Sequence, residues 1–198
     1  MTIILHQDSF HLSFSDNRDS VFVVKEEEQY TVYTLDNLGF NESLERTTEQ
    51  LNPLAGPFHM EDGKKGNVLA VTIVGIEITR NVGMSSSGIL PEFLTAQHRK
   101  EVMGEPVTYW VIDRQNCSPV VSGKLDETIC LSAAPMIGCI RCADPTSKMP
   151  MSSTEADEVG GNLDFKKIGI GSTVFLPVVG DGALFYLGDV HYQQAAGK

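Results

Sequence analysis

The apolar runs of this chain are short, rich in β-branched and aromatic residues, and separated by turn-forming residues, a pattern typical of strands. The longest run, Val68–Ile78, is apolar on both faces, so we expect a central strand that is covered on both sides. Further strands are expected at Val21–Val24, Tyr30–Leu35, Val107–Ile112 and Ile137–Cys142. These runs favour a mainly β fold, a sandwich or barrel with few short helices.

Glycine-rich turns and two short helical patterns complete this prediction. Gly180-Asp181-Gly182 separates the apolar runs Thr173–Val179 and Ala183–Leu187, which predicts a β-hairpin. Short helices are predicted at Asn41–Leu51, with Asn41 as the cap, and at Leu90–Met103. The polar segment 148–158 shows no periodicity and is expected to be a long loop.

Length and charge limit the classes of function. The chain has 198 residues, which suits a single domain over residues 1–198, and its formal net charge is −11. An acidic chain repels phosphate groups, so we expect no nucleic-acid partner and no binding to anionic membranes. No signal peptide is visible, and no apolar run approaches the roughly 20 residues of a membrane helix. The expected location is therefore cytoplasmic.

Two of the four cysteines have the spacing of a zinc or redox pair. Cys139 and Cys142 are separated by two residues, but the sequence contains no second such pair to complete a tetrahedral zinc site. Strand alternation sends residues at positions i and i+3 to opposite faces. We therefore predict that both thiols are buried, reduced and free of metal.

Asp164 and His191 are candidates for chemistry because each lies next to glycines at the end of an apolar strand. Glycine lets the backbone approach closely at such positions. A carboxylate and an imidazole could share a cation there, or form a base with its orienting partner. A polar turn beside a surface histidine is the simpler alternative. If the two side chains share one cleft, they should lie within about 8 Å of each other, given ligand bonds of about 2 Å.

Three stretches, in this order and spacing, resemble the acetamidase/formamidase family: Asn52–Pro57 leading through Gly66–Val71, then Ala134–Ile140, then Gly160–Asp164 continuing to Gly188–His191. Members of that family have a mainly β fold and hydrolyse the linear C–N bond of short amides, such as formamide and acetamide, to a carboxylate and ammonia. The resemblance therefore implies an amidase with a small amide substrate.

The resemblance also implies a site and a cofactor. The cofactor would be a divalent metal, zinc being the usual suggestion. Water activated by the metal or by a carboxylate would attack the amide carbonyl, and the Asn162 amide or backbone N–H groups would hold the oxyanion. The implied catalytic residues are Asp36, Asn162, Asp164 and His191, the substrate-binding residues are Gly160 and Gly161, and the metal ligands are Asp36, Asp164, Asp189 and His191.

The sequence departs from the family pattern in three ways. Val159 stands where many members have a histidine, Lys198 stands where they have a glutamate, and members continue into further strands. A second hypothesis is therefore an inactive or split homologue that binds a small molecule or a partner chain through the inherited cleft. Those further strands would cover the apolar segment Thr173–Leu187, so we expect a homo-oligomer or a complex with a second chain.

Overall fold

The computed structural model describes residues 2–49, 51–85, 94–102, 108–113, 118–122, 132–147 and 149–194. The chain divides into two compact units, one formed by Met1–Glu77 with Ala134–Lys198 and the other by Ile78–Ala133. The expectation of one domain over residues 1–198 stays a prediction. Both units are built mainly from strands, which confirms the mainly β fold class.

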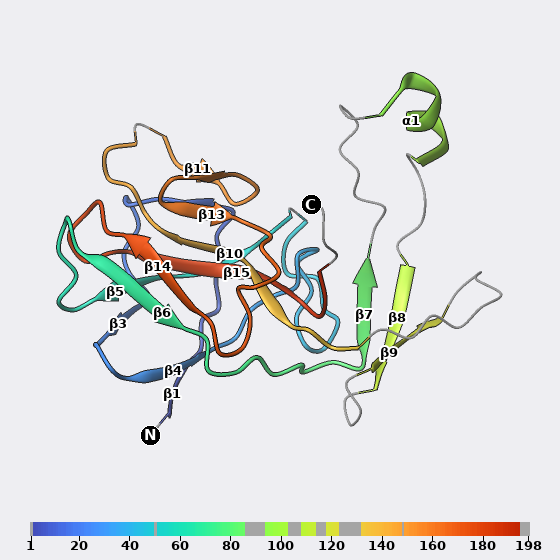
Figure 1. The fold of residues 1–198 in the computed structure, drawn as a ribbon, viewed down its shortest axis with the longest axis horizontal. Coiled ribbons are helices and arrows are strands. Elements are labelled where there is room, and N and C mark those ends of the chain that lie inside the picture. The colour runs from blue at the N-terminus through green and yellow to red at the C-terminus, as the bar shows by residue number, and fades with distance from the viewer. Residues whose placement is uncertain are drawn as a thin grey trace. The chain divides into compact units, whose positions relative to one another are not determined.

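The larger unit contains the strands that matter for the site (Figure 1). Their bounds are β1 (Thr2–Leu5), β2 (Ser13–Phe14), β3 (Phe22–Val24), β4 (Gln29–Val32), β5 (Leu54–Met60), β6 (Val68–Thr72), β10 (Met136–Cys142), β11 (Met151–Ser152), β12 (Ala156–Asp157), β13 (Gly160–Asn162), β14 (Thr173–Pro177) and β15 (Phe185–His191).

A six-stranded sheet with the order β12-β13-β10-β15-β5-β3 forms the centre of this unit. Strand β10 pairs antiparallel with β13 on one side and with β15 on the other. Every residue of β10 is buried, as expected for an apolar strand covered on both faces. This confirms the strand predicted at Ile137–Cys142.

Residues of β10 contribute to two apolar clusters. Ile140 and Cys142 belong to one cluster with Phe58 and Phe185, whereas Cys139 packs with Tyr186 and others in a second cluster. Cys139 and Cys142 are both free thiols and both buried, as predicted. Burial raises the pKa of the Cys142 thiol to about 12, so this thiol stays protonated at neutral pH.

The prediction for Val68–Ile78 is wrong in length and in position. Strand β6 ends at Thr72 and pairs with β14 alone, in a two-stranded sheet. Its burial alternates, with Leu69 and Val71 packed on the core and Val68 62% exposed. Apolar residues on both faces of this run therefore do not mark a central strand, because the second face meets solvent.

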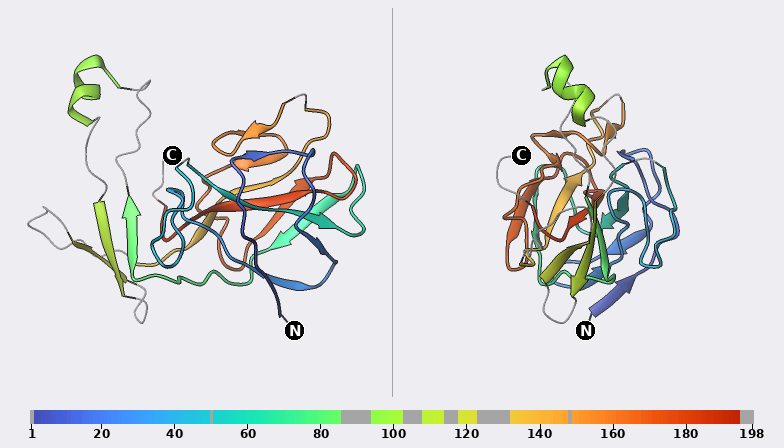
Figure 2. Two further views of the ribbon diagram at one scale, coloured as in Figure 1. Left: turned by 180° about the vertical axis from the view of Figure 1, so that it is seen from behind. Right: turned by 90° about the vertical axis from the view of Figure 1, so that its right-hand side faces the viewer.

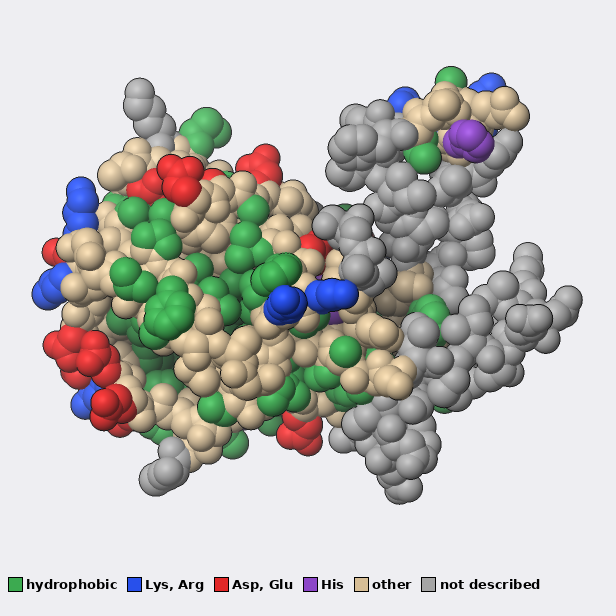
Figure 3. Space-filling view, in the orientation of Figure 1, with side chains coloured by type: hydrophobic (Ala, Val, Ile, Leu, Met, Phe, Trp, Pro, Cys, Tyr) green, Lys and Arg blue, Asp and Glu red, His purple; other side chains and the backbone are tan. Residues whose placement is uncertain are grey.

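The hairpin predicted across Gly180–Gly182 is also wrong. Strand β14 pairs with β6, whereas β15 pairs with β10 and β5, so the turn connects two different sheets (Figures 1 and 2). Phe175 on the outer face of β14 is 68% exposed. Figure 3 shows apolar side chains on this face of the molecule. Association through the Thr173–Leu187 segment stays a prediction.

Two further expectations need correction. No helix forms at 41–49 in the described chain, because the Asn41 side chain accepts hydrogen bonds from the backbone N–H groups of Ser43 and Glu45 and closes a turn instead. The segment 148–158, expected to be a loop, contains the short strands β11 and β12. Strand β11 pairs with β2, which lies far away in the sequence, and β12 pairs with β13, which follows it directly.

The smaller unit contains an antiparallel sheet with the order β7-β8-β9 and a short helix. Its elements are β7 (Val82–Ser85), α1 (Ala96–Val102), β8 (Thr108–Asp113) and β9 (Ser118–Ser122). Strand β8 agrees with the predicted strand at 107–112. Helix α1 is shorter than predicted, and Leu90 and Met103 lie outside the described residues, as do Cys117 and Cys130. Among the described helices, none is long and apolar enough to span a membrane.

Candidate metal centre

Asp164, Asp189 and His191 form a compact cluster in the larger unit. One potential ligand atom from each residue lies within 4.8 Å of the other two. The Nε2 atom of His191 is 3.2 Å from Asp164 Oδ1 and 3.1 Å from Asp189 Oδ1. The prediction that Asp164 and His191 lie within about 8 Å of each other is therefore confirmed.

The strands of the central sheet position these three side chains. Asp189 and His191 are two residues apart at the end of β15, a spacing that in a strand places side chains on one face. Asp164 follows β13, which lies on the opposite side of β10. The backbone N–H groups of Leu163 and Asp164 donate to the Gly138 carbonyl oxygen of β10 at 2.9 and 3.2 Å. These bonds hold the loop that carries Asp164 against the sheet.

Both carboxylates are held on unusual backbone. Asp164 has a φ of 46° and Asp189 a φ of 50°, in the left-handed region that residues other than glycine rarely adopt. Aspartate tolerates this region better than most residues, but the conformation still costs free energy. Two such positions within one three-residue cluster indicate that the fold maintains this arrangement at the expense of stability, as functional sites do.

The Cys139 thiol connects Asp189 to Asn162. Cys139 Sγ lies 3.3 Å from Asn162 Oδ1, 3.3 Å from the Ser153 carbonyl oxygen and 3.9 Å from Asp189 Oδ2. Burial raises the pKa of this thiol well above its usual range, and the charges of Asp189 and Asp164 raise it further. The thiol therefore stays protonated and acts as a donor. Asn162 and Asp189 thus both lie near the Cys139 Sγ atom, and the catalytic role expected for Asn162 stays a prediction.

The charge of His191 is set by opposing effects. Burial lowers the pKa of the imidazole, but the hydrogen-bonding and charge interactions with Asp164 and Asp189 outweigh it and raise the pKa to about 9. At neutral pH the imidazole would then carry a proton between two carboxylates. A divalent cation at the same point would take over the role of that positive charge.

This raised pKa makes the stability of the chelator-treated protein depend on pH. The folded-state pKa of about 9 exceeds the ordinary value of 6.5, so the stabilisation by His191 is present in full below about pH 6.5. It is lost as pH rises through 9, and its upper limit is roughly 3 kcal/mol. Urea unfolding with EDTA at pH 6, 7.5 and 9 measures this effect. The wild type should be more stable than His191→Gln at pH 6, and the difference should shrink as pH rises. An advantage that does not change with pH would contradict this.

Other predicted residues lie outside this cluster. Asp36 Oδ1 accepts hydrogen bonds from the N–H groups of Leu38 and Phe40 at 3.0 and 2.8 Å and so closes its own loop. The structure does not bring Asp36 into the three-residue group. Gly160 and Gly161 are buried within β13, between β10 and β12, where they permit close packing of three strands. Val159, at the position of the family histidine, is 4% exposed.

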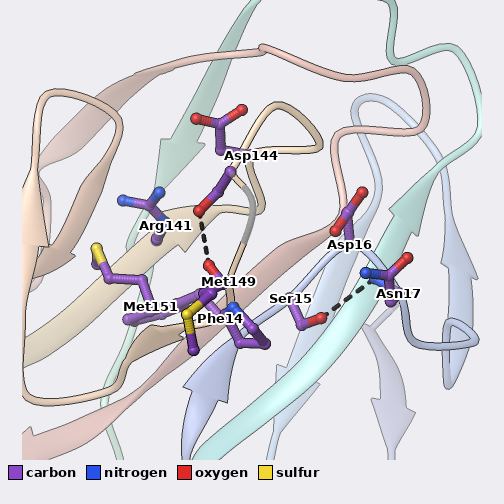
Figure 4. Close-up of a pocket in the computed structure, with 10 residues that line it drawn as sticks. Phe14, Ser15, Asp16, Asn17, Arg141, Asp144, Met149 and Met151 are labelled. Carbon is purple, nitrogen blue, oxygen red and sulfur yellow. Dashed lines mark hydrogen bonds between the residues drawn. The ribbon is translucent and has the colours of Figure 1, made fainter.

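A polar pocket elsewhere in this unit is too small for a substrate (Figure 4). Its volume of about 20 Å³ suits one water molecule. The lining residues include Phe14, Arg141, Asp144 and Met151, and none belongs to the cluster. Arg141 pairs with Asp157 and donates to the Gly160 carbonyl oxygen, so its charge has a structural partner.

Sequence reasoning did not identify Gly138 and Cys139 as parts of the site. Cys139 was considered only as a partner of Cys142, although its neighbours in space are Asn52, Asn162 and Asp189. The available signal was its place in the Ala134–Ile140 stretch that resembles the family. That stretch supplies β10, the strand between the two segments that carry the cluster.

Comparison with known proteins agrees with this fold. Residues 142–198 match the model of the Acetamidase/Formamidase family. An acetamidase from Bacillus halodurans has 24% sequence identity and a TM-score of 0.74, over 100% of this chain and 64% of its own. A predicted acetamidase/formamidase from Thermoanaerobacter tengcongensis has 27% identity and a TM-score of 0.78, over 100% of this chain and 63% of its own.

A more distant fold relative is a gamma lactamase from Delftia acidovorans, with 16% identity and a TM-score of 0.73, over 99% of this chain and 62% of its own. No curated protein matches the sequence significantly. The chain thus spans a little under two thirds of the length of these solved structures. The match over residues 142–198 and the shared fold make the chain similar to the Acetamidase/Formamidase family.

Proposed function

We propose that this protein is a metal-assisted amidase that hydrolyses short linear amides of the formamide and acetamide type. The observation that carries the proposal is the cluster of Asp164, Asp189 and His191, whose ligand atoms lie within 4.8 Å of one another. The similarity to the Acetamidase/Formamidase family supports the reaction class. A purely structural role explains three such close polar groups, two of them on strained backbone, less economically than a binding site does.

The residues present fit a divalent metal. Catalytic zinc sites take three protein ligands, from histidine nitrogen and carboxylate oxygen, and keep one position open. The cluster supplies one nitrogen and two carboxylates. His191 Nε2 lies 3.2 Å from Asp164 Oδ1 and 3.1 Å from Asp189 Oδ1, so loss of its proton leaves a lone pair beside both carboxylates. Such a nitrogen is suited to donate its lone pair to a cation.

Asp164, Asp189 and His191 would hold the metal, and zinc bound there would supply a Lewis acid and water of lowered pKa. The chain's own residues orient the amide. The oxygen of the Asn162 side chain accepts from the Cys139 thiol, so its NH₂ group remains as a donor toward the carbonyl oxygen of a substrate. A donor of this kind stabilises the oxyanion that develops as the carbonyl is attacked.

The burial of the cluster's side chains limits the size of the substrate. The side chains of His191, Asp164 and Asp189 are 17%, 14% and 4% exposed, which leaves little room for a bulky group beside the reacting carbon. Formamide and acetamide carry no more than a methyl group there. Longer amides are therefore expected to react more slowly.

Ammonia release tests this proposal. The purified chain, after EDTA treatment, is incubated with formamide, acetamide and butyramide, with and without added zinc. We expect zinc-dependent ammonia release that is fastest with the two smaller amides. The variant Asn162→Ala should lose about 100-fold in rate, the cost of one oxyanion donor, while Asn67→Ala, in a surface turn, should not. The absence of ammonia release with every amide and metal would favour a non-catalytic binding protein.

A further inference from the structure

We propose that Gly138 is a positioning residue that fixes the two carboxylates of the cluster relative to each other. This inference rests on the proposed function, because the carboxylates matter as a pair only if they hold a metal. Gly138 lies in the middle of β10, between β13 and β15. The space that a Cβ would occupy on Gly138 is taken by Asp189. The carbonyl oxygen of Gly138 accepts a hydrogen bond from the Asp164 backbone.

The contact with Asp189 leaves no room for a side chain on Gly138. A Cβ at this position would lie 2.6 Å from Asp189 Oδ2, 3.0 Å from its Cγ and 2.8 Å from its carbonyl oxygen. These distances are well below van der Waals contact. The Asp189 backbone belongs to β15, which is hydrogen-bonded to β10, so it cannot move away without disturbing the sheet. A methyl group on Gly138 would therefore both displace the carboxylate and press on the β15 backbone.

The contact with Asp164 is made by hydrogen bonds. The Gly138 carbonyl oxygen accepts from Leu163 N at 2.9 Å and from Asp164 N at 3.2 Å. Asp164 has a φ of 46°, so these bonds hold a turn that the isolated chain would rarely form. A shift of the β10 backbone at Gly138 would therefore move Asp164 together with Asp189.

The need for glycine at this position is steric. Its φ lies outside the left-handed region, where other glycines of the chain such as Gly161 (φ of 131°) are found. An alanine at 138 would thus cost no backbone strain, and the Asp189 carboxylate and carbonyl are the atoms it would meet. The structure assigns this glycine to the geometry of the site rather than to a turn.

The variant Gly138→Ala tests the inference by calorimetric zinc titration. Gly75→Ala is the matched control, because Gly75 has no left-handed φ and nothing within 4 Å of an added Cβ. We expect 10–100-fold weaker zinc binding for Gly138→Ala and unchanged binding for Gly75→Ala, the range typical when a residue that orients metal ligands is altered. The cobalt-substituted variant should also show a shifted visible absorption spectrum, which a loss of stability alone would not produce.

The outcomes separate this inference from the proposed function. Wild-type protein that binds no zinc would overturn both. If the wild type binds zinc and Gly138→Ala has the same zinc affinity and the same cobalt spectrum, the positioning role alone is overturned. If Gly138→Ala does not fold, the double variant Gly138→Ala/Asp189→Gly should regain part of the lost stability, because it removes the two carboxylate atoms that the methyl group meets and suits the left-handed φ of residue 189. A double variant no more stable than Gly138→Ala would assign the need for glycine to the backbone carbonyl of residue 189 and would overturn the inference.

Discussion

Replacing Asp189 with asparagine is expected to weaken zinc binding at least 100-fold, a larger loss than altering a residue that only orients a ligand. The substitution preserves the shape of the side chain but removes one of two carboxylates within about 3 Å of His191 Nε2. Asparagine is a poorer ligand for a divalent cation because it carries no charge. The measurement is calorimetric zinc titration of the full chain at constant pH and salt.

The matched control is Asp62→Asn, which makes the same chemical change at an exposed position in the same unit. It should bind zinc as the wild type does. Equal zinc affinity in Asp189→Asn and wild type would show that the metal, if bound, is held elsewhere. Far-ultraviolet circular dichroism of both variants confirms that the comparison is made between folded proteins.

The variant Gly161→Ala is expected to lose about 3 kcal/mol of stability, combining overpacking with the strain of a positive φ. Gly161 has a φ of 131°, and an added Cβ would lie 2.3 Å from the Glu155 carbonyl oxygen and 2.7 Å from Ala156 Cα. Both are backbone atoms of the segment that forms β12, so they yield only if β12 separates from β13.

Urea unfolding measures this loss, with Gly75→Ala as the control that should stay within about 0.5 kcal/mol of wild type. A Gly161→Ala variant as stable as the control would show that β12 moves away at little cost. The same variant should also weaken zinc binding, because β13 leads directly into the loop that carries Asp164.

The parts of the structure that could be predicted depend on local patterns. The buried strand β10 follows from a continuous apolar run, and the opposite packing of Cys139 and Cys142 follows from strand alternation. The meeting of Asp164 and His191 was expected because both lie at glycine-flanked strand ends. Their mutual distance, however, depends on the pairing of β10 with both β13 and β15.

The failures arose where a local pattern fits two structures. Asn41 can cap a helix or close a turn, and its bonds to Ser43 and Glu45 show that the turn prevails. The run Val68–Ile78 could be covered on one face or on both, which only its neighbours in space decide. The family resemblance implied a site role for Asp36, whereas its carboxylate accepts hydrogen bonds from the backbone of its own loop.

Strand β15 lies inside the central sheet although it follows its two partners, β5 and β10, in the sequence. Neither partner can complete its pairing until β15 has been synthesised. Contacts across such long separations are expected to make folding slow, because a long loop must close before any pairing is gained. Since β15 also carries Asp189 and His191, the nascent chain acquires two of the three proposed metal ligands and the closure of its core in the same step.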